Sequence, residues 1–190
     1  MVDETEKLEK LNQFYLAIIL RYKELIEEKE ELSISELPTL VTPKDERVVA
    51  KAEEIKRNFL SYTYGRDFYE AAKRAFEFVK KEIDEIVTPV QFWLTPAETL
   101  SFRIGDPMDK NVLLCSLLLQ LGNPSAKVLV EVNNAMSAFV YFEFNGKYYL
   151  LDIKSGIREF SGKDALYGSV INSDDSTAYE FNNQMYNDIK

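Results

Sequence analysis

Apolar residues at helical spacing dominate the first part of the chain. Between residues 4 and 32 they stand three and four positions apart, which predicts one amphipathic helix. The residues on its apolar face are Leu8, Leu11, Tyr15, Ile18, Ile19, Tyr22, Leu25 and Ile26. The charged flanks do not repeat in heptads, so we expect this helix to fold back on the rest of the chain rather than pair with a second copy.

Two further helices are predicted between residues 42 and 86. Thr42-Pro43 is an N-cap followed by proline at the first helical position, so a helix is expected over residues 42–62, ended by Gly65. The next helix is expected over residues 67–86, where apolar residues again mark one face. The segment before both helices, residues 33–41, contains a proline and is expected to be a linker.

Two short motifs in the middle of the chain open helices. Thr95-Pro96-Ala97-Glu98 has a cap, a proline and an acid at the third helical position, which predicts a short helix to about Phe102. Asp106-Pro107-Met108-Asp109 repeats the pattern and opens a helix that ends at Leu121, before Gly122. This second helix is apolar on nearly all sides, so we expect it to be buried at the centre of the fold, with Asp106 and Asp109 as capping residues.

The pattern changes to strands after this helix. Strands are predicted over residues 126–133, 137–144 and 147–153, and Asn145-Gly146 predicts a two-residue type I′ turn between the last two. A turn or short helix is expected near residues 163–167, and the tail from Thr177 is expected to add a strand or hairpin.

The Asn145-Gly146 turn also predicts which residues of the hairpin face each other. Phe144 faces Lys147, Phe142 faces Tyr149, and the same register places Phe139 opposite Asp152. Ser137 shares a face with Phe139, so Ser137 and Asp152 are expected to be diagonal neighbours, roughly 7 Å apart at the backbone.

Composition and charge exclude several classes of protein. The 190 residues are 46% hydrophobic and carry a formal net charge of −9. This content supports a folded core, and the negative charge opposes binding to nucleic acid. The first residues are unlike a signal peptide, and no apolar run is long enough for a membrane span. We expect a cytoplasmic protein that has no membrane contact and is a monomer, with an unknown protein or peptide as its partner and with nucleic acid disfavoured by its charge.

The inventory of reactive side chains is small. The chain contains no histidine and a single cysteine, Cys115. Cys115 lies among leucines in the middle of a helix, where a thiol behaves as a small hydrophobic group. Asp174 and Asp175 offer too few ligands for a hard-ion site. The sequence therefore predicts no metal site and no cofactor.

Three segments, taken in order, carry a resemblance to a known family. They are TPAETL at residues 95–100, GDPMDKNVLLCSLLLQLG at 105–122 and SAFVYFEFNGKYYLLD at 137–152. Their order resembles the transglutaminase-like superfamily, and more narrowly the small archaeal transglutaminase-like proteins of unknown function. The resemblance covers about residues 67–155 and implies an α+β, papain-like cysteine proteinase fold with helices packed on an antiparallel sheet. We expect an N-terminal helical extension over residues 1–64, packed on a core domain over residues 65–190.

The resemblance also assigns positions to a catalytic triad. In active members, the helix opens with Gly-Asp-Cys and an Asp two positions on, a later strand begins with His-Ala, and the next strand ends with Leu-Asp. Residue by residue, the cysteine falls on Pro107, the histidine on Ser137 and the aspartate on Asp152. Proline cannot be a nucleophile, but it is a favourable first residue for a helix. Two of the three catalytic groups are therefore missing.

The predicted function follows from this departure. The sequence favours a catalytically inactive transglutaminase-like domain, a binding or interaction module of unknown ligand, with no catalytic residue assigned. Two alternatives stay open. One is a hydrolase or transferase with a non-standard site around Asp152 and Ser137. The other is a nucleic-acid-binding domain derived from the same fold, which the net charge of −9 opposes.

Overall fold

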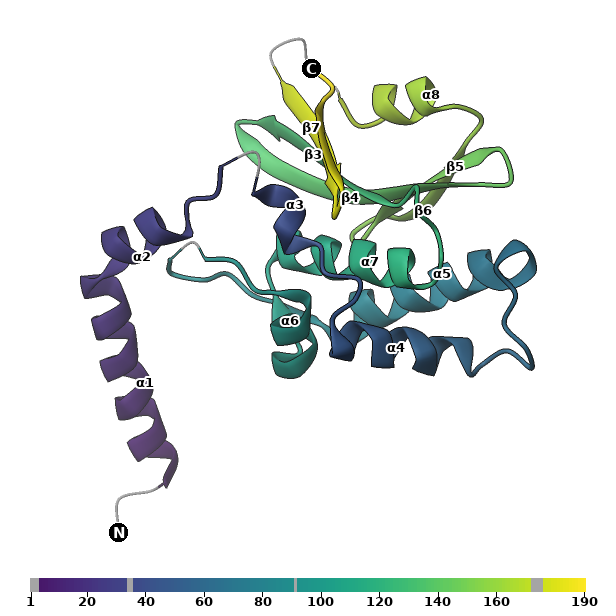
Figure 1. The fold of residues 1–190 in the computed structure, drawn as a ribbon. Helices are drawn as coiled ribbons and strands as arrows, with labels where there is room; N and C mark the ends of the chain where they lie inside the picture. Colours follow the sequence, from purple (N-terminus) through teal and green to yellow (C-terminus); the bar gives the residue numbers. More distant parts are fainter. Residues whose placement is uncertain (1–3, 34–35, 91, 172–175) are drawn as a thin grey trace. The chain divides into compact units, whose positions relative to one another are not determined.

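The fold is given by a computed structural model that describes residues 4–33, 36–90, 92–171 and 176–190. The chain divides into two units, Met1–Leu32 with Val87–Trp93, and Ser33–Ile86 with Leu94–Lys190. The second unit contains a large sheet and the helices that pack on it (Figure 1). The domain boundary predicted between residues 64 and 65 stays a prediction.

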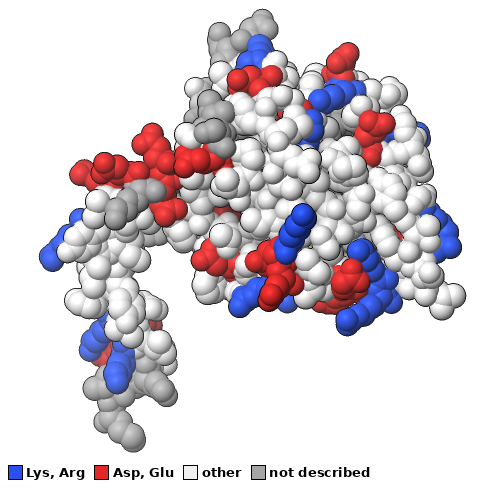
Figure 2. All heavy atoms as spheres, viewed as in Figure 1, with Lys and Arg blue, Asp and Glu red and all other residues white. Residues whose placement is uncertain are grey.

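The first unit is built mainly from two helices. The segment predicted as one helix forms α1 (Glu4–Arg21) and α2 (Lys23–Glu30), and the prediction of a single helix is wrong at Tyr22. The Tyr22 N–H is shared between the carbonyls of Ile18 and Ile19, at 3.2 and 3.1 Å, which tightens the last turn of α1. The Trp93 indole N–H donates to the Glu30 carbonyl at 2.8 Å. Acidic side chains gather over α2 in Figure 2.

The predicted linker at residues 33–41 contains a short helix. This helix, α3 (Leu37–Leu40), has Pro38 in its first turn and lies against the C-terminal strands β7 (Thr177–Asn182) and β8 (Met185–Asp188). The side chains of Leu37 and Val41 are buried. The segment is therefore part of the core of the second unit.

Helix α4 (Glu46–Lys56) is shorter than the predicted helix over residues 42–62 and begins later. The Asp45 carboxylate accepts the backbone N–H groups of Arg47 at 2.9 Å and Val48 at 3.4 Å. The Thr42 N–H donates instead to the Ser116 hydroxyl at 3.1 Å. Because a carboxylate cap satisfies two N–H groups at once, the helix starts after Asp45, and the predicted start at Thr42 is wrong.

Helix α5 (Tyr64–Glu82) begins and ends earlier than the helix predicted over residues 67–86. It includes Gly65, so the prediction that Gly65 ends a helix is wrong. The Asp67 carboxylate accepts the Thr63 N–H at 2.7 Å and fixes the start. The chain then leaves helical geometry because β1 (Asp84–Glu85) pairs in parallel with β2 (Ile104–Gly105).

The two predicted capping motifs are confirmed. Helix α6 (Pro96–Phe102) opens with a capping box between Thr95 and Glu98, and α7 (Pro107–Gln120) opens with one between Asp106 and Asp109. Gly122 follows α7 with φ = 108°, a left-handed conformation that a residue with a side chain rarely adopts. Most side chains of α7 are buried, as its apolar pattern predicts.

Among the described residues, six strands form one antiparallel sheet in the order β6-β5-β4-β3-β7-β8. The strands not yet introduced are β3 (Lys127–Asn133), β4 (Ala135–Phe144), β5 (Lys147–Asp152) and β6 (Gly156–Phe160). The predicted hairpin register is confirmed, since Phe144 pairs with Lys147 and Phe142 with Tyr149. The tail forms the β7–β8 hairpin, whereas β6 has no predicted counterpart.

Helices cover the two faces of the sheet unequally (Figure 1). Helix α7 packs against β3 and β4, and α4, α5 and α6 pack around α7. On the opposite face, α8 (Lys163–Gly168) lies over β5 and β6, close to the position expected for a short helix. The α7 face contains an aromatic cluster in which Phe68 of α5 contacts Phe142 and Phe144 of β4. This arrangement is the α+β fold that the sequence predicts.

The α8 face contains a buried polar network centred on Glu180 of β7. The Glu180 carboxylate accepts hydrogen bonds from Lys127 at 2.6 Å, from Lys163 at 3.1 Å and from the hydroxyl groups of Tyr141 and Tyr167. Burial opposes the ionised form, but these donors outweigh it and lower the pKa of Glu180 to about 2. The network joins β3, β4, β7 and α8, so it belongs to the core of the fold.

Candidate functional site

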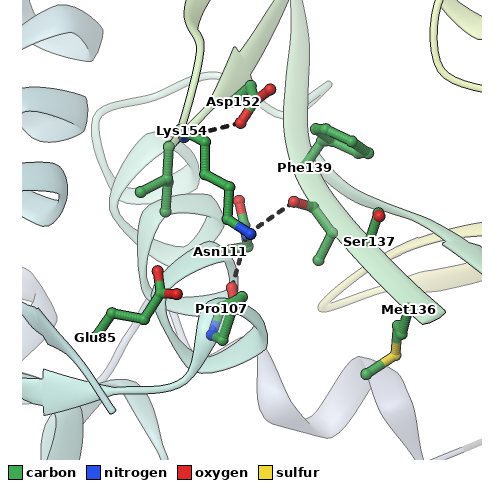
Figure 3. A pocket seen from close by; sticks show the side chains of 10 residues that line it. Glu85, Pro107, Asn111, Met136, Ser137, Phe139, Asp152 and Lys154 are labelled. Atoms are coloured by element: carbon green, nitrogen blue, oxygen red, sulfur yellow. Dashed lines mark hydrogen bonds between the residues drawn. The ribbon is translucent and has the colours of Figure 1, made fainter. Parts of the chain in front are cut away.

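A cavity of about 280 Å³ lies where the first turn of α7 meets β4 and the end of β5. We call it the α7 pocket. It is lined by Glu85, Pro107, Asn111, Met136, Ser137, Ala138, Phe139, Asp152, Ile153 and Lys154, all in the second unit of the chain (Figure 3).

All three triad positions line this one pocket. Pro107 is the first residue of α7, Ser137 lies on β4, and Asp152 is the last residue of β5. The β4–β5 ladder runs to the pair Val140 and Leu151, and the next pair in that register is Phe139 with Asp152. No hydrogen bond joins Ser137 to Asp152 among the described residues. The structure therefore brings the three positions to one cavity, without a hydrogen bond between the two polar ones.

The Asp152 carboxylate is held by its own turn. It accepts the Lys154 backbone N–H at 2.8 Å and the Ser155 hydroxyl. Burial favours the neutral acid, but the hydrogen bonds from Ser155 and Lys154 prevail and lower the pKa of Asp152. An ionised carboxylate with a lowered pKa is a weak general base at neutral pH, and it remains available to bind a donor or a cation.

Asn111 is the pocket residue that the sequence pattern conceals. It lies one helical turn after Pro107 and is only 2% exposed. Its Nδ2 donates to the carbonyls of Pro107 at 2.7 Å and Ala138 at 3.1 Å, so the side chain ties α7 to β4 (Figure 3). Its Oδ1 is the buried side-chain polar atom that lacks a hydrogen-bond partner among the described residues. A polar residue at the start of an otherwise apolar helix is the signal that could have identified it.

The start of α7 is capped by two carboxylates of the chain. The Asp109 N–H donates to Asp106 at 2.8 Å, and Asp109 in turn accepts the N–H groups of Asp106 at 3.0 Å and Leu94 at 3.1 Å. Burial of Asp109, together with the charge of Asp106, raises the pKa of Asp109 to about 7. Neither aspartate lines the pocket. The first turn of this helix therefore has no thiol to activate, and the N–H groups of Asp109 and Lys110 are bonded within the fold.

Charged groups surround the pocket on two sides. Glu85 on β1 and Lys154 after β5 are exposed lining residues. Lys110, next to Asn111 on α7, is only 3% exposed, and burial lowers the pKa of its ammonium group, while the charges of Glu85 and Asp84 act in the opposite direction. The Lys110 ammonium group has no hydrogen bond within the described part of the chain, whereas its backbone N–H donates to the Asp106 carbonyl at 3.1 Å.

Cys115 lies outside the pocket, further along α7. It is completely buried, and burial raises the pKa of its thiol. It stands eight residues after Pro107, about 12 Å along the helix axis. The structure therefore gives this thiol no route to the pocket.

The described residues contain neither a metal-binding cluster nor a membrane-spanning helix. In residues 4–33, 36–90, 92–171 and 176–190, no group of three or more Asp, Glu or Cys side chains could hold a metal ion. Asp174 and Asp175 lie outside the described residues. Of the helices that the structure describes, none combines the length and apolar character needed to cross a bilayer.

Comparison with known proteins supports the fold. No protein-family model matches the chain, and no curated protein matches it. Among solved structures, Legionella pneumophila LapG is similar with a TM-score of 0.52 and 15% identity, over 82% of this chain and 87% of that chain. Its EGTA-treated form gives a TM-score of 0.49 and 16% identity over 75% and 86% of the two chains. The fold of this chain is therefore transglutaminase-like, as the sequence predicts, and at this identity the likeness concerns the fold alone.

Proposed function

We propose that this protein is a catalytically inactive domain of transglutaminase-like fold that binds a ligand in the α7 pocket. The observation that carries the proposal is the composition of that pocket. A cavity remains at the triad positions, yet Pro107 and Ser137 stand where a thiol and an imidazole would be needed.

The absence of activity is argued from two missing steps. Acyl transfer needs a nucleophile, and the only thiol of the chain is buried elsewhere in α7. It also needs a base to accept a proton, and the chain contains no histidine. Ser137 has no hydrogen bond to a base among the described residues, and the pKa of Asp152 is lowered. The alternative of a hydrolase or transferase centred on Ser137 and Asp152 is therefore the weaker reading.

Three further properties belong to the same proposal. We propose that the protein is cytoplasmic and that it is a monomer. We also propose that it is related to the small archaeal transglutaminase-like proteins that its sequence resembles. Nucleic acid is the disfavoured ligand, since the net charge of −9 repels a phosphate backbone.

A turnover assay tests the inactivity. The full chain is incubated with capped peptides containing glutamine or asparagine, together with a primary amine, and the products are followed by mass spectrometry. We expect the same trace products with the natural chain, with Asp152→Ala and with buffer. Hydrolysis or amine transfer that appears with the natural chain and disappears with Asp152→Ala or Ser137→Ala would establish the alternative enzyme.

A further inference from the structure

The chemistry of the α7 pocket narrows the kind of ligand it can take. At its floor, both protons of the Asn111 amide are donated to the carbonyls of Pro107 and Ala138, so the one hydrogen-bonding atom left on this side chain is the acceptor Oδ1. A buried acceptor without a partner costs free energy in the empty protein. A ligand whose N–H or O–H donor displaces the atoms that cover Oδ1 would remove that cost.

The other polar groups of the pocket are also mainly acceptors. The carboxylates of Glu85 and Asp152 line it from two further elements, so acceptors converge from β1, α7 and the end of β5. The Asp152 carboxylate accepts the Lys154 N–H through Oδ1 and the Ser155 hydroxyl through Oδ2, and a carboxylate has about four acceptor sites in all. Figure 3 shows Glu85, Asn111 and Asp152 at separate places around the cavity. A ligand must therefore carry several donors that point in different directions.

The charges near the pocket favour a cation. Glu85, Asp152 and Asp84 stand against Lys154, Arg158 and the buried Lys110, and Asp106 adds negative charge at the start of α7. The local balance is negative, in keeping with the net charge of the chain. Lys154 is the one lining group that would repel a cation, and its side chain is exposed to solvent, which screens its charge.

We infer that the α7 pocket binds a guanidinium group on an apolar stem, either a small guanidine or the arginine side chain of a partner. This inference rests on the proposed function and specifies its ligand. A guanidinium carries five N–H donors in a planar fork, which suits acceptors on three elements. It is more weakly hydrated than an ammonium, so burial against Asn111 is less costly, and it stacks on aromatic rings such as that of Phe139. Met136 and Ile153 give the stem apolar contacts.

Three probes with the same stem separate the possible chemistries. Butylguanidinium, butylammonium and the neutral butylurea are titrated into the ¹⁵N-labelled full chain, and NMR follows the Asn111 side-chain amide and the backbone N–H of Ala138 and Lys154. We expect saturable shifts at these groups with butylguanidinium, at least about tenfold weaker binding of butylammonium, and weaker binding still of butylurea. A capped Gly-Arg-Gly peptide distinguishes the two sources. Tighter binding of the peptide indicates a partner's arginine, and equal or weaker binding indicates a small guanidine.

Single substitutions test the assigned contacts. Glu85→Gln and Asp152→Asn should each weaken butylguanidinium binding about tenfold, since each removes a charge-assisted acceptor. Lys154→Ala should strengthen binding, since it removes the opposing charge. The matched control is Glu82→Gln, an exposed glutamate three positions before Glu85 that does not line the pocket. Asn111 stays unchanged because its amide holds two carbonyls of the fold, and its own NH₂ signal is the reporter.

Several results would overturn the inference. These are butylguanidinium shifts that do not saturate, butylurea or butylammonium binding as tightly as butylguanidinium, and Glu85→Gln behaving like Glu82→Gln. None of them affects the proposed inactivity, which the turnover assay decides separately. Conversely, turnover in that assay would remove the proposed function while the guanidinium titration still reports on the pocket.

Discussion

At the scale of the residue, helix α7 carries a thiol, but not at the position where a thiol would be reactive. Pro107 occupies the start of α7, where a thiolate would be stabilised by the helix dipole, and Cys115 occupies a completely buried position two turns later. The pKa of the Cys115 thiol is raised by burial. The only thiol of the chain is therefore part of the packing of the core.

The first prediction follows from that burial. A thiol reagent in native buffer should label Cys115 slowly, and denaturant should accelerate the labelling strongly. Cys115→Ala should cost on the order of 1 kcal/mol of unfolding free energy, the usual size of a modest core truncation. Chemical denaturation measures the second quantity. Rapid labelling of the native protein would show that α7 opens or that the thiol is accessible.

The second prediction uses the absence of histidine from the chain. Ser137→His places an imidazole on the α7 pocket beside Asp152. A nearby carboxylate favours the charged ring, so the pKa of His at position 137 should rise above its usual value of about 6.5. NMR titration reads this single imidazole without overlap. When Ser137→His is combined with Asp152→Asn, the rise in pKa should vanish. An imidazole pKa that is the same with and without Asp152→Asn would show that the two positions lie further apart than the β4–β5 register implies.

Sequence patterns identify some residues of the pocket and miss others for a physical reason. Ser137 and Asp152 follow from the hairpin register, because a two-residue turn fixes every cross-strand pair after it. Asn111 and Lys154 are brought to the pocket by packing of α7 against β4 and by the turn after β5. Glu85 arrives through a parallel pair of two-residue strands. Contacts of that kind leave no periodic trace in the chain.

At the scale of the element, local capping chemistry explains which predictions succeed. Helices α6 and α7 begin as predicted, because their capping boxes are complete within a few residues. The predicted start of α4 is wrong because two possible caps, Thr42 and Asp45, lie within four positions, and the Asp45 carboxylate is the one that caps the helix. Among the described residues, strand β6 pairs only with β5, and its mixed apolar and polar pattern gives little sign of a strand.

The third prediction concerns the cap of α7. Asp106→Ala removes the acceptor of the Asp109 N–H, so it should cost about 0.5–2 kcal/mol of unfolding free energy. The loss should depend on pH. The natural chain loses stability as pH rises from about 4 to 7, because the folded pKa of Asp109, about 7, lies above its unfolded value of 3.8. In Asp106→Ala the pKa of Asp109 is raised less, because the negative charge of Asp106 is gone.

The cost of Asp106→Ala in unfolding free energy should therefore decrease as pH rises. Denaturation of natural chain and Asp106→Ala at pH 5 and pH 8 should show the larger difference at pH 5. Asp45→Ala, the cap of α4, is the matched control, since it removes a cap without a neighbouring buried acid. Equal stability of Asp106→Ala and the natural chain would mean that α7 is not held by this cap.

At the scale of the whole molecule, the two faces of the sheet are held by different means. Aromatic and aliphatic packing holds the α7 face, and the Glu180 network holds the α8 face. The sequence predicts the first through apolar patterns. The sequence gives no sign of the Glu180 network, because its members are spread over more than fifty positions and meet only in the folded protein. These members are Lys127, Tyr141, Lys163, Tyr167 and Glu180.

The fourth prediction tests the Glu180 network. The pKa of Glu180 in the folded protein, about 2, lies below the ordinary 4.5. The contribution of its carboxylate to stability is therefore present above pH 4.5 and is lost as pH falls towards 2. Glu180→Gln should cost about 3 kcal/mol at pH 7, because it leaves the Lys127 ammonium without its carboxylate. It should also flatten the acid limb of the stability profile. Lys147→Met, which breaks an exposed ion pair with Glu159, is the control and should change stability little.

The fifth prediction concerns the N-terminal residues. A chain that begins at Thr42 lacks Leu37 and Val41, which are 8% and 3% exposed, so it should be less stable than a chain that begins at Ser33 by about 3 kcal/mol or more. The chain from Ser33 then isolates the effect of the first 32 residues. If the apolar face of residues 4–32 folds back, as we expect, removing it should lower the unfolding midpoint and the solubility. A Ser33 chain of unchanged stability, together with a full chain that is dimeric and a truncated one that is monomeric, would make this segment an assembly element instead.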